Sequence, residues 1–208
     1  MAVLWTSNSN AANENGVRIL LFGDSLIAGY GVLEENTIPT QMQKYYDGKD
    51  INIEVIDAGV SGDTTSGGRT RFEWTVNKQA PDMIFISLGG NDLLRGIPPQ
   101  VIEENIEFML KTAKQKNIPV VISQTKAPEN ITGQYSKDFN KVFIDLPKKY
   151  SAATYPFLLN VLTDKESQMQ NDGIHPNLDG VKVIVEDFAP YLYQIATEKG
   201  LFDQENSQ

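Results

Sequence analysis

Short runs rich in hydrophobic residues recur along the chain, and most of them end at Gly, Asp or another polar residue. Such runs are typical of strands that are buried on both faces, as in a parallel sheet. The pattern predicts strands over Val17–Phe22, Ile51–Ile56, Met83–Leu88, Ile118–Ser123 and Tyr155–Val161.

Between these runs, hydrophobic residues recur at the spacing of one helix face. The predicted helices are Ile38–Tyr46, Arg69–Asn77, Gln100–Lys116, Asp138–Tyr150 and Leu178–Thr197, and residues 61–68 are predicted to be a loop. Proline removes a backbone donor from a helix, so Pro147 and Pro190 are expected to break or kink the last two helices.

Strands that alternate with helices over this length predict a parallel sheet with helices on both faces. The expected fold is therefore an α/β three-layer α/β/α sandwich with a central sheet of about five strands. A length of 208 residues suits one domain. We expect that domain to span 17–199, between a flexible segment at 1–16 and a polar tail at 200–208.

Composition excludes several classes of partner. A formal net charge of −9 argues against a nucleic-acid partner, because phosphate backbones are bound by basic patches. The chain has no cysteine, which excludes disulfides and thiolate metal sites. Its hydrophobic runs are too short to form a transmembrane segment. The start of the chain also lacks the basic and apolar stretches of a signal peptide. Oligomeric state stays open.

The unusual residues follow the predicted strands. Gly23-Asp24-Ser25-Leu26 comes after the first strand, Gly59 to Asp63 after the second, and Gly89-Gly90-Asn91-Asp92 after the third. Asp172-Gly-Ile-His175 precedes the last helix. Ligands bind at the carboxyl ends of the strands in such sheets, so these loops are expected to converge on one site.

His175 is the only histidine, and Asp172 stands three residues before it. A carboxylate at that position can hold the ring and leave Nε2 free as a base, although an Asp on a surface turn followed by His is the simpler interpretation. Ser25 is either a nucleophile at a strand-to-helix turn or a helix N-cap.

Gly62 and Asn91 are candidates for an oxyanion hole, since a glycine N–H can approach a ligand closely and the Asn amide is a neutral donor. Each could equally be an ordinary turn residue. Asp24, Asp63 and Asp92 are interpreted as caps that orient the loops. A zinc site is improbable with one His and no Cys, whereas magnesium with a bound phosphate stays conceivable.

These four segments together resemble the sequence blocks of the SGNH (GDSL) hydrolases. The matching blocks are G-D-S-L at 23–26, the glycine of V-S-G-D-T at 62, G-G-N-D at 89–92 and D-G-I-H-P at 172–176. The likeness extends from residue 17 to about residue 195. Within the family, the chain is most similar to the bacterial thioesterase I, lysophospholipase L1 and arylesterase group.

The resemblance implies a flavodoxin-like fold and a serine hydrolase of small acyl esters or thioesters. It implies Ser25 as the nucleophile, Asp172 and His175 as its partners, and an oxyanion hole formed by Ser25, Gly62 and Asn91. It implies no metal and no cofactor, and it matches Leu93–Pro98 to a mobile loop of relatives. Many relatives are periplasmic or secreted, so that location is expected, with a cytoplasmic one left open.

Six residues near the predicted rim, five of them hydrophobic, are candidates for contact with substrate. Core packing is the more frequent fate of hydrophobic side chains. The six candidates are Asp24, Leu26, Leu93, Leu94, Ile97 and Ile174. Two alternatives to an esterase stay open. One is a carbohydrate O-deacetylase of the same fold. The other is a non-catalytic flavodoxin-like module in which Thr64, Thr65, Ser66 and Gly67 cradle a phosphate.

Overall fold

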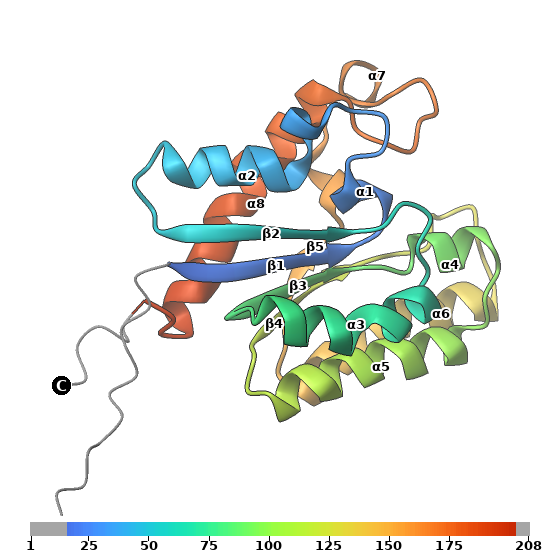
Figure 1. The fold of residues 1–208 in the computed structure, drawn as a ribbon. Helices are drawn as coiled ribbons and strands as arrows, with labels where there is room; N and C mark the ends of the chain where they lie inside the picture. Colours follow the sequence, from blue (N-terminus) through green and yellow to red (C-terminus); the bar gives the residue numbers. More distant parts are fainter. Residues whose placement is uncertain (1–15, 203–208) are drawn as a thin grey trace, which may run out of the picture.

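Residues 16–202 are described by the computed structural model, and within them five parallel strands form one sheet in the order β2-β1-β3-β4-β5 (Figure 1). The order is that of a flavodoxin-like doubly wound sheet. The strands are β1 (Val17–Gly23), β2 (Ile53–Gly59), β3 (Met83–Ser87), β4 (Val120–Gln124) and β5 (Ala153–Pro156). The predicted parallel sheet is confirmed.

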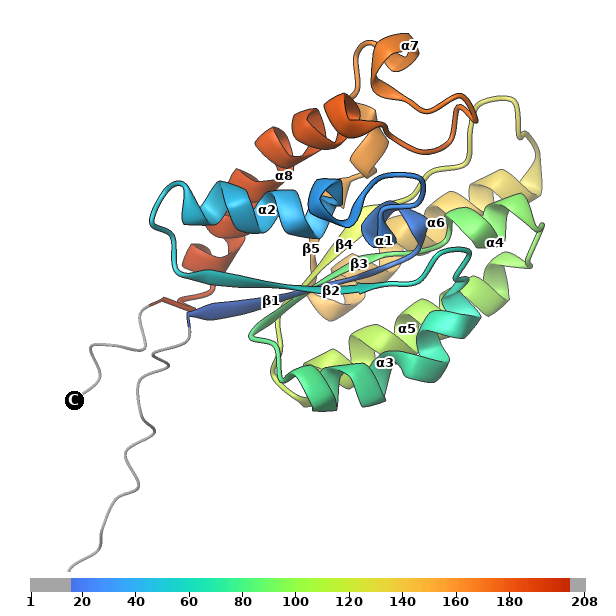
Figure 2. The same cartoon turned by 45° about the horizontal axis from the view of Figure 1, so that its top comes forward.

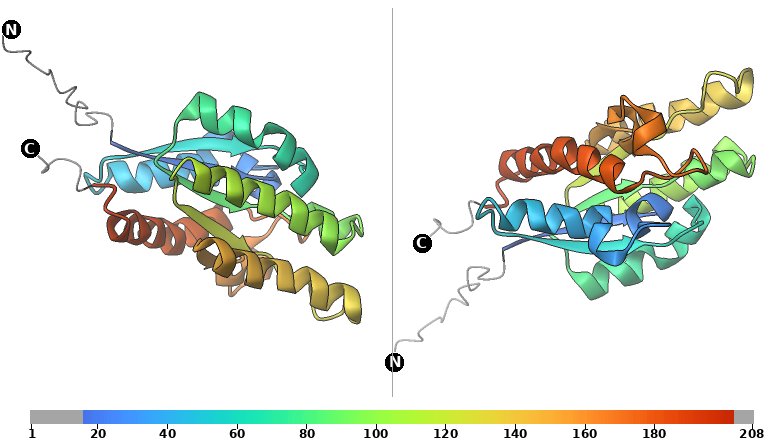
Figure 3. Two further views of the ribbon diagram at one scale, coloured as in Figure 1. Left: turned by 90° about the horizontal axis from the view of Figure 1, so that it is seen from below. Right: turned by 90° about the horizontal axis from the view of Figure 1, so that it is seen from above.

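Helices cover both faces of the sheet, as predicted (Figure 2). On one face lie α1 (Ser25–Ala28), α2 (Ile38–Asp47) and α8 (Leu178–Glu198), and on the other lie α3 (Thr65–Gln79), α5 (Pro99–Gln115) and α6 (Gln134–Tyr150). Views from below and above show the two helix layers separately (Figure 3). The shorter elements are η1 (Glu34–Asn36), α4 (Gly90–Leu94), η2 (Leu158–Val161) and α7 (Lys165–Gln168).

Strand β1 shows why the hydrophobic runs are continuous. Its residues alternate between the two layers, so that Ile19 and Leu21 pack toward α2 and α8 while Leu20 and Phe22 pack toward α3, α5 and α6. All four side chains are fully buried. Because both faces of the strand are covered here, none of these four positions favours a polar residue.

The sequence prediction placed the start of α3 too late. The helix begins at Thr65, so residues 65–68 form its first turn and not a loop. Thr64 caps this turn, because its side chain accepts a hydrogen bond from the Gly67 N–H. The two glycines disguised the turn, since glycine is a poor helix former.

One further prediction is wrong, and of the break or kink expected at Pro147 and Pro190 the break does not occur. The strand predicted over 155–161 ends at Pro156, and η2 follows it. Neither Pro147 nor Pro190 ends its helix. Pro190 and Glu186 lie on the exposed side of α8, so water can satisfy the Glu186 carbonyl that lacks its usual N–H donor.

The predicted N-terminal segment and C-terminal tail lie outside the described residues, except for Gly16 and residues 200–202. Of the helices that the structure describes, none combines the length and apolar character that crossing a bilayer requires.

Candidate active site

The loops after β1, β2 and β3 meet the loop before α8 around one cleft of about 650 Å³. Ser25, Gly62, Asn91 and His175 all line it. The cleft lies beside the point where the sheet order reverses, because β1 pairs with β2 on one side and with β3 on the other. This is the place at which doubly wound sheets bind ligands.

Ser25 is the first residue of α1, and its hydroxyl is not used for capping. Asp24 is the N-cap instead, since its Oδ1 accepts a hydrogen bond from the Leu26 N–H at 3.1 Å. The Ser25 Oγ lies 2.9 Å from His175 Nε2. The N-cap interpretation of Ser25 is therefore wrong, and its hydroxyl is paired with the imidazole.

Asp172 folds back on His175 through a tight turn. Its Oδ2 lies 2.6 Å from His175 Nδ1, while its Oδ1 accepts the backbone N–H groups of Ile174 (2.9 Å) and His175 (3.0 Å). The hydrogen bond from His175, followed by the two backbone bonds, lowers the pKa of Asp172 from 3.8 to about 2. The carboxylate thus stays charged and fixes the Nδ1–H tautomer of the ring.

Tyr30 packs against His175 and was missed in the sequence. The two ring centroids are 4.6 Å apart, with an interplanar angle of 39°. The Gln170 side chain donates to the Tyr30 carbonyl at 2.7 Å and to the Pro176 carbonyl at 3.0 Å, which ties the loop after α1 to the histidine loop. The only sequence signal was the position of Tyr30 between two glycines. In the structure both of them, Gly29 and Gly31, have positive φ.

The candidate oxyanion donors come from three elements. The Ser25 N–H opens α1 and so has no partner within that helix. Gly62 has a φ of +79°, and its N–H has no acceptor within residues 16–202. The Asn91 Nδ2 donates to the Asp63 carbonyl at 3.0 Å and to the Asp24 carboxylate at 3.4 Å. The second bond is long, which leaves that N–H available to a stronger acceptor.

Asp24 forms part of the cleft floor, with only 6% of its surface exposed. Burial raises the pKa of this carboxyl from 3.8 to about 6, against the opposing hydrogen bond from Leu26. The Asp24 carboxylate accepts two hydrogen bonds, one from the Leu26 N–H as the cap of α1 and one from Asn91 Nδ2.

Most of the predicted apolar contacts with substrate do line the cleft, namely Leu26, Leu93, Leu94 and Ile174. Leu94 is 71% exposed and Ile174 is 48% exposed. The prediction for Ile97 needs correction, because its side chain does not line the cleft. It packs against the core on the α5 side of the sheet. The Ile97 carbonyl accepts the Tyr135 hydroxyl at 2.9 Å. Lining residues that sequence analysis missed are Phe157, Leu159, Lys126 and Lys165.

The proposed phosphate cradle at residues 64–67 already has partners inside the protein. Thr64 caps α3, and the Thr65 N–H and hydroxyl both donate to the buried Asp92 carboxylate at 2.8 and 2.6 Å. The Ser66 hydroxyl accepts from the Asn105 side chain at 2.9 Å. These contacts orient the loop, so the cap interpretation of Asp92 holds, and the Thr65 N–H, the Thr65 hydroxyl and the Gly67 N–H are already used as donors inside the protein. Within the described part of the chain, no three acidic or His side chains cluster as metal ligands would.

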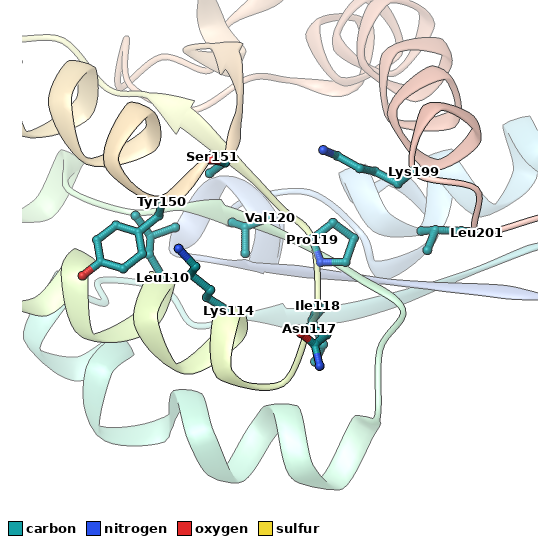
Figure 4. A pocket seen from close by; sticks show the side chains of 11 residues that line it. Leu110, Lys114, Asn117, Ile118, Pro119, Val120, Tyr150, Ser151, Lys199 and Leu201 are labelled. Carbon is teal, nitrogen blue, oxygen red and sulfur yellow. The ribbon is translucent and has the colours of Figure 1, made fainter.

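A second cavity of about 460 Å³ lies at the amino ends of the strands, where β4 begins (Figure 4). Lys114, Tyr150 and Lys199 line it together with hydrophobic residues. It contains neither Ser25 nor His175 nor any other predicted site residue. The cleft at the carboxyl ends of the strands is therefore the candidate active site.

Comparisons with known proteins show which sequences this chain resembles. The sequence model of the GDSL-like Lipase/Acylhydrolase family matches residues 21–183. The arylesterase of Vibrio mimicus is 33% identical over 85% of this chain and 88% of its own length. The thioesterase 1/protease 1/lysophospholipase L1 of Escherichia coli K12 is 32% identical over 91% of this chain and 88% of its own length.

A solved structure is similar over nearly the same span. It is the psychrotrophic esterase EstA from Pseudoalteromonas, inhibited by monoethylphosphonate. The TM-score is 0.82 at 28% identity, and the alignment covers 86% of this chain and 98% of that one.

Proposed function

Since the chain belongs to the GDSL-like lipase/acylhydrolase family and is an ester-hydrolysing enzyme, we propose that it is a serine esterase with Ser25 as its nucleophile. The observation that carries the proposal is the continuous contact from Ser25 through His175 to Asp172, at 2.9 and 2.6 Å. A hydroxyl, a base and a group that orients the base form the arrangement that serine hydrolysis needs.

In the first half of the reaction, Ser25 Oγ attacks the carbonyl carbon and His175 Nε2 takes the hydroxyl proton. Asp172 stabilises the imidazolium that forms. The oxyanion of the tetrahedral intermediate accepts hydrogen bonds from the N–H groups of Ser25 and Gly62 and from Asn91 Nδ2. The intermediate collapses, and the imidazolium gives its proton to the leaving alcohol or thiol.

In the second half, water attacks the acyl group on Ser25 and His175 again takes a proton. Collapse of this second intermediate returns the proton to Ser25 Oγ and releases the carboxylic acid. His175 is the only histidine, so one ring serves as base and as acid in both halves.

The substrate is proposed to be a small ester or thioester with a short to medium acyl chain. Hydrophobic side chains that line the cleft support an apolar acyl group, and they include Leu93, Leu94 and Phe157. The relatives named arylesterase and thioesterase 1/lysophospholipase L1 support both linkages. A periplasmic or secreted location belongs to the proposal and rests on the resemblance to this group; fractionation of cells that express the natural gene tests it.

A fluorophosphonate probe tests the assignment of the nucleophile. The wild-type protein should be labelled at Ser25, as read by mass spectrometry of the labelled peptide, and Ser25→Ala should not be labelled. Ser61 also lines the cleft, so Ser61→Ala is the matched control that should keep full labelling. A folded protein that resists the probe contradicts the proposal.

A panel of substrates tests the reaction class. Nitrophenyl esters of increasing chain length, acyl thioesters and acetylated sugars cover the candidate substrates. If the protein hydrolyses only the acetylated sugars, the proposed esterase function is wrong and the protein is a carbohydrate O-deacetylase.

A further inference from the structure

Arg71 lies outside the cleft but contacts the loops that carry Ser25 and the oxyanion donors. We propose that Arg71 is a positioning residue, whose guanidinium sets the nucleophile Ser25 and the donors Gly62 and Asn91 at the correct distance from one another. This inference rests on the proposed serine esterase function.

The guanidinium makes four contacts from helix α3. Its Nη2 donates to the Gly23 carbonyl at 3.0 Å, its Nη1 donates to the Ala58 carbonyl at 2.9 Å, and its Nε donates to Asp63 Oδ2 at 2.8 Å. The plane of the group also lies over the Phe22 ring, 3.8 Å from the centroid. A planar fork with five donors can bridge these acceptors and lie on a ring at the same time, whereas an ammonium is a compact group with three donors and no flat face.

Each acceptor belongs to a different part of the proposed machinery. Gly23 is the last residue of β1 and stands two residues before Ser25. Ala58 lies near the end of β2. Asp63 follows Gly62, and its carbonyl is the acceptor that holds Asn91 Nδ2 at 3.0 Å. The Arg71 side chain therefore joins the turn before Ser25, the loop that contains Gly62 and, through Asp63, the Asn91 amide.

Other contacts also join the first two loops, because Asn91 Nδ2 bridges Asp24 and Asp63 and Gly59 lies against the backbone of α1. Pairing between β1 and β2 ends at Gly23 and Gly59, and beyond it the Val60 N–H donates to the Gly23 carbonyl at 3.0 Å. The side chains of Arg71 and Asp63 are only 22% and 9% exposed, so water does not weaken their ion pair as it would at the surface.

Two glycines allow α3 to approach closely enough for these contacts. A Cβ on Gly67 would lie 1.9 Å from Asp63 Oδ1, and one on Gly68 would lie 2.5 Å from Leu88 Cδ1. A larger residue at either position would meet the side chain of Asp63 or Leu88, and a shift of Asp63 would move the carboxylate that pairs with Arg71. Gly67, one of the pair that hid this helix in the sequence, thus leaves room for the carboxylate that pairs with Arg71.

The test compares Arg71→Ala and Arg71→Lys with Arg18→Ala. Arg18 pairs with Glu54 at the far end of β1 and is 28% exposed, which makes it a matched control for the loss of a half-buried arginine ion pair. Steady-state kinetics with a nitrophenyl ester, the midpoint of thermal unfolding and the rate of fluorophosphonate labelling are measured for each.

For Arg71→Ala we expect kcat to fall by about 100-fold, because a displacement of roughly 1 Å in a catalytic group has an effect of that size. KM should stay within about 3-fold of wild type, since Arg71 does not line the cleft. The kcat of Arg71→Lys should lie between those of Arg71→Ala and wild type. Arg18→Ala should lower only the midpoint of thermal unfolding. Guanidinium ion at millimolar concentration should restore part of the activity to Arg71→Ala and none to Arg18→Ala.

A folded Arg71→Ala with kcat within about 3-fold of wild type overturns the inference, as does a loss of kcat that guanidinium fails to restore. If Arg71→Ala does not fold, Arg71→Lys decides in its place, and unchanged kcat and labelling rate in that variant overturn the inference. Wild-type protein that neither hydrolyses esters nor takes the probe refutes the proposed function instead. The two failures are therefore distinct.

Discussion

Asp24 carries a buried carboxyl, so replacing it with Asn should change how stability depends on pH. The pKa of Asp24 rises from 3.8 in the unfolded chain to about 6 in the folded protein, chiefly because the group is buried. A difference of that size corresponds to about 3 kcal/mol between the two protonation states. This is a large part of the 5–15 kcal/mol that typically stabilises a domain.

The direction follows from proton binding. Between pH 4 and pH 6 the folded protein keeps a proton on Asp24 that the unfolded chain has lost, so the free energy of unfolding falls as pH rises. Asn cannot titrate, and its side-chain oxygen can still accept the Leu26 N–H. Relative to Asp24→Asn, wild type should therefore lose about 2.4 kcal/mol from pH 4 to pH 7, with the rest of the roughly 3 kcal/mol lost below pH 4, and change little above pH 7.

Urea denaturation of both proteins at constant ionic strength, in steps across pH 4 to pH 7.5, measures this difference directly. Titrations elsewhere in the molecule largely cancel, because both proteins share them. A difference that stays constant across this range would refute the reasoning, since it would mean that burial does not penalise the charge on Asp24.

Four further variants test named contacts. Asn91→Ala should lower kcat by about 100- to 1,000-fold with little effect on KM in steady-state assays, and unchanged turnover would remove Asn91 from the oxyanion hole. Asp172→Asn should lower kcat by about 1,000- to 10,000-fold by favouring the wrong tautomer of His175, and activity near wild type would argue against the triad. The same variant should be less stable than wild type at neutral pH and should lose that deficit as pH falls from about 4 toward 2, because the pKa of Asp172 is lowered in the folded protein. Leu94→Ser should keep its unfolding midpoint, since Leu94 is 71% exposed, and should lower kcat/KM for a hexanoyl ester more than for an acetyl ester; an equal effect on both would exclude Leu94 from acyl binding. Phe188→Ala should cost about 3–5 kcal/mol in urea denaturation, and a cost under about 1 kcal/mol would contradict the packing of Phe188 against Phe85 and Tyr155.

The sheet and the contacts among Ser25, Asp172 and His175 could be predicted because their signals are local in sequence. Continuous burial on both faces makes β1 a hydrophobic run, and the loop that follows it carries its polar residues in a few consecutive positions. Asp172 and His175 are three residues apart, so one tight turn with Gly173 at a φ of +65° brings them together.

What the sequence did not predict depends on contacts between distant residues. Arg71 has two main-chain carbonyls as partners, at Gly23 and Ala58, which are 48 and 13 residues away. Any residue supplies a carbonyl, so such contacts leave no pattern of residue types. The end of β5 was missed for another reason, since hydrophobic residues continue beyond Pro156 and only the backbone changes from strand to η2.

The packing of the tilted Tyr30 ring against the only histidine has a spectroscopic consequence. Proton NMR of this protein contains one imidazole spin system, so its resonances need no assignment by mutation. The Tyr30 ring, with its centroid 4.6 Å from that of His175, shifts those resonances by its ring current. The shift of one peak therefore reports on the surroundings of the proposed base, to which the Tyr30 ring and any bound ligand both contribute.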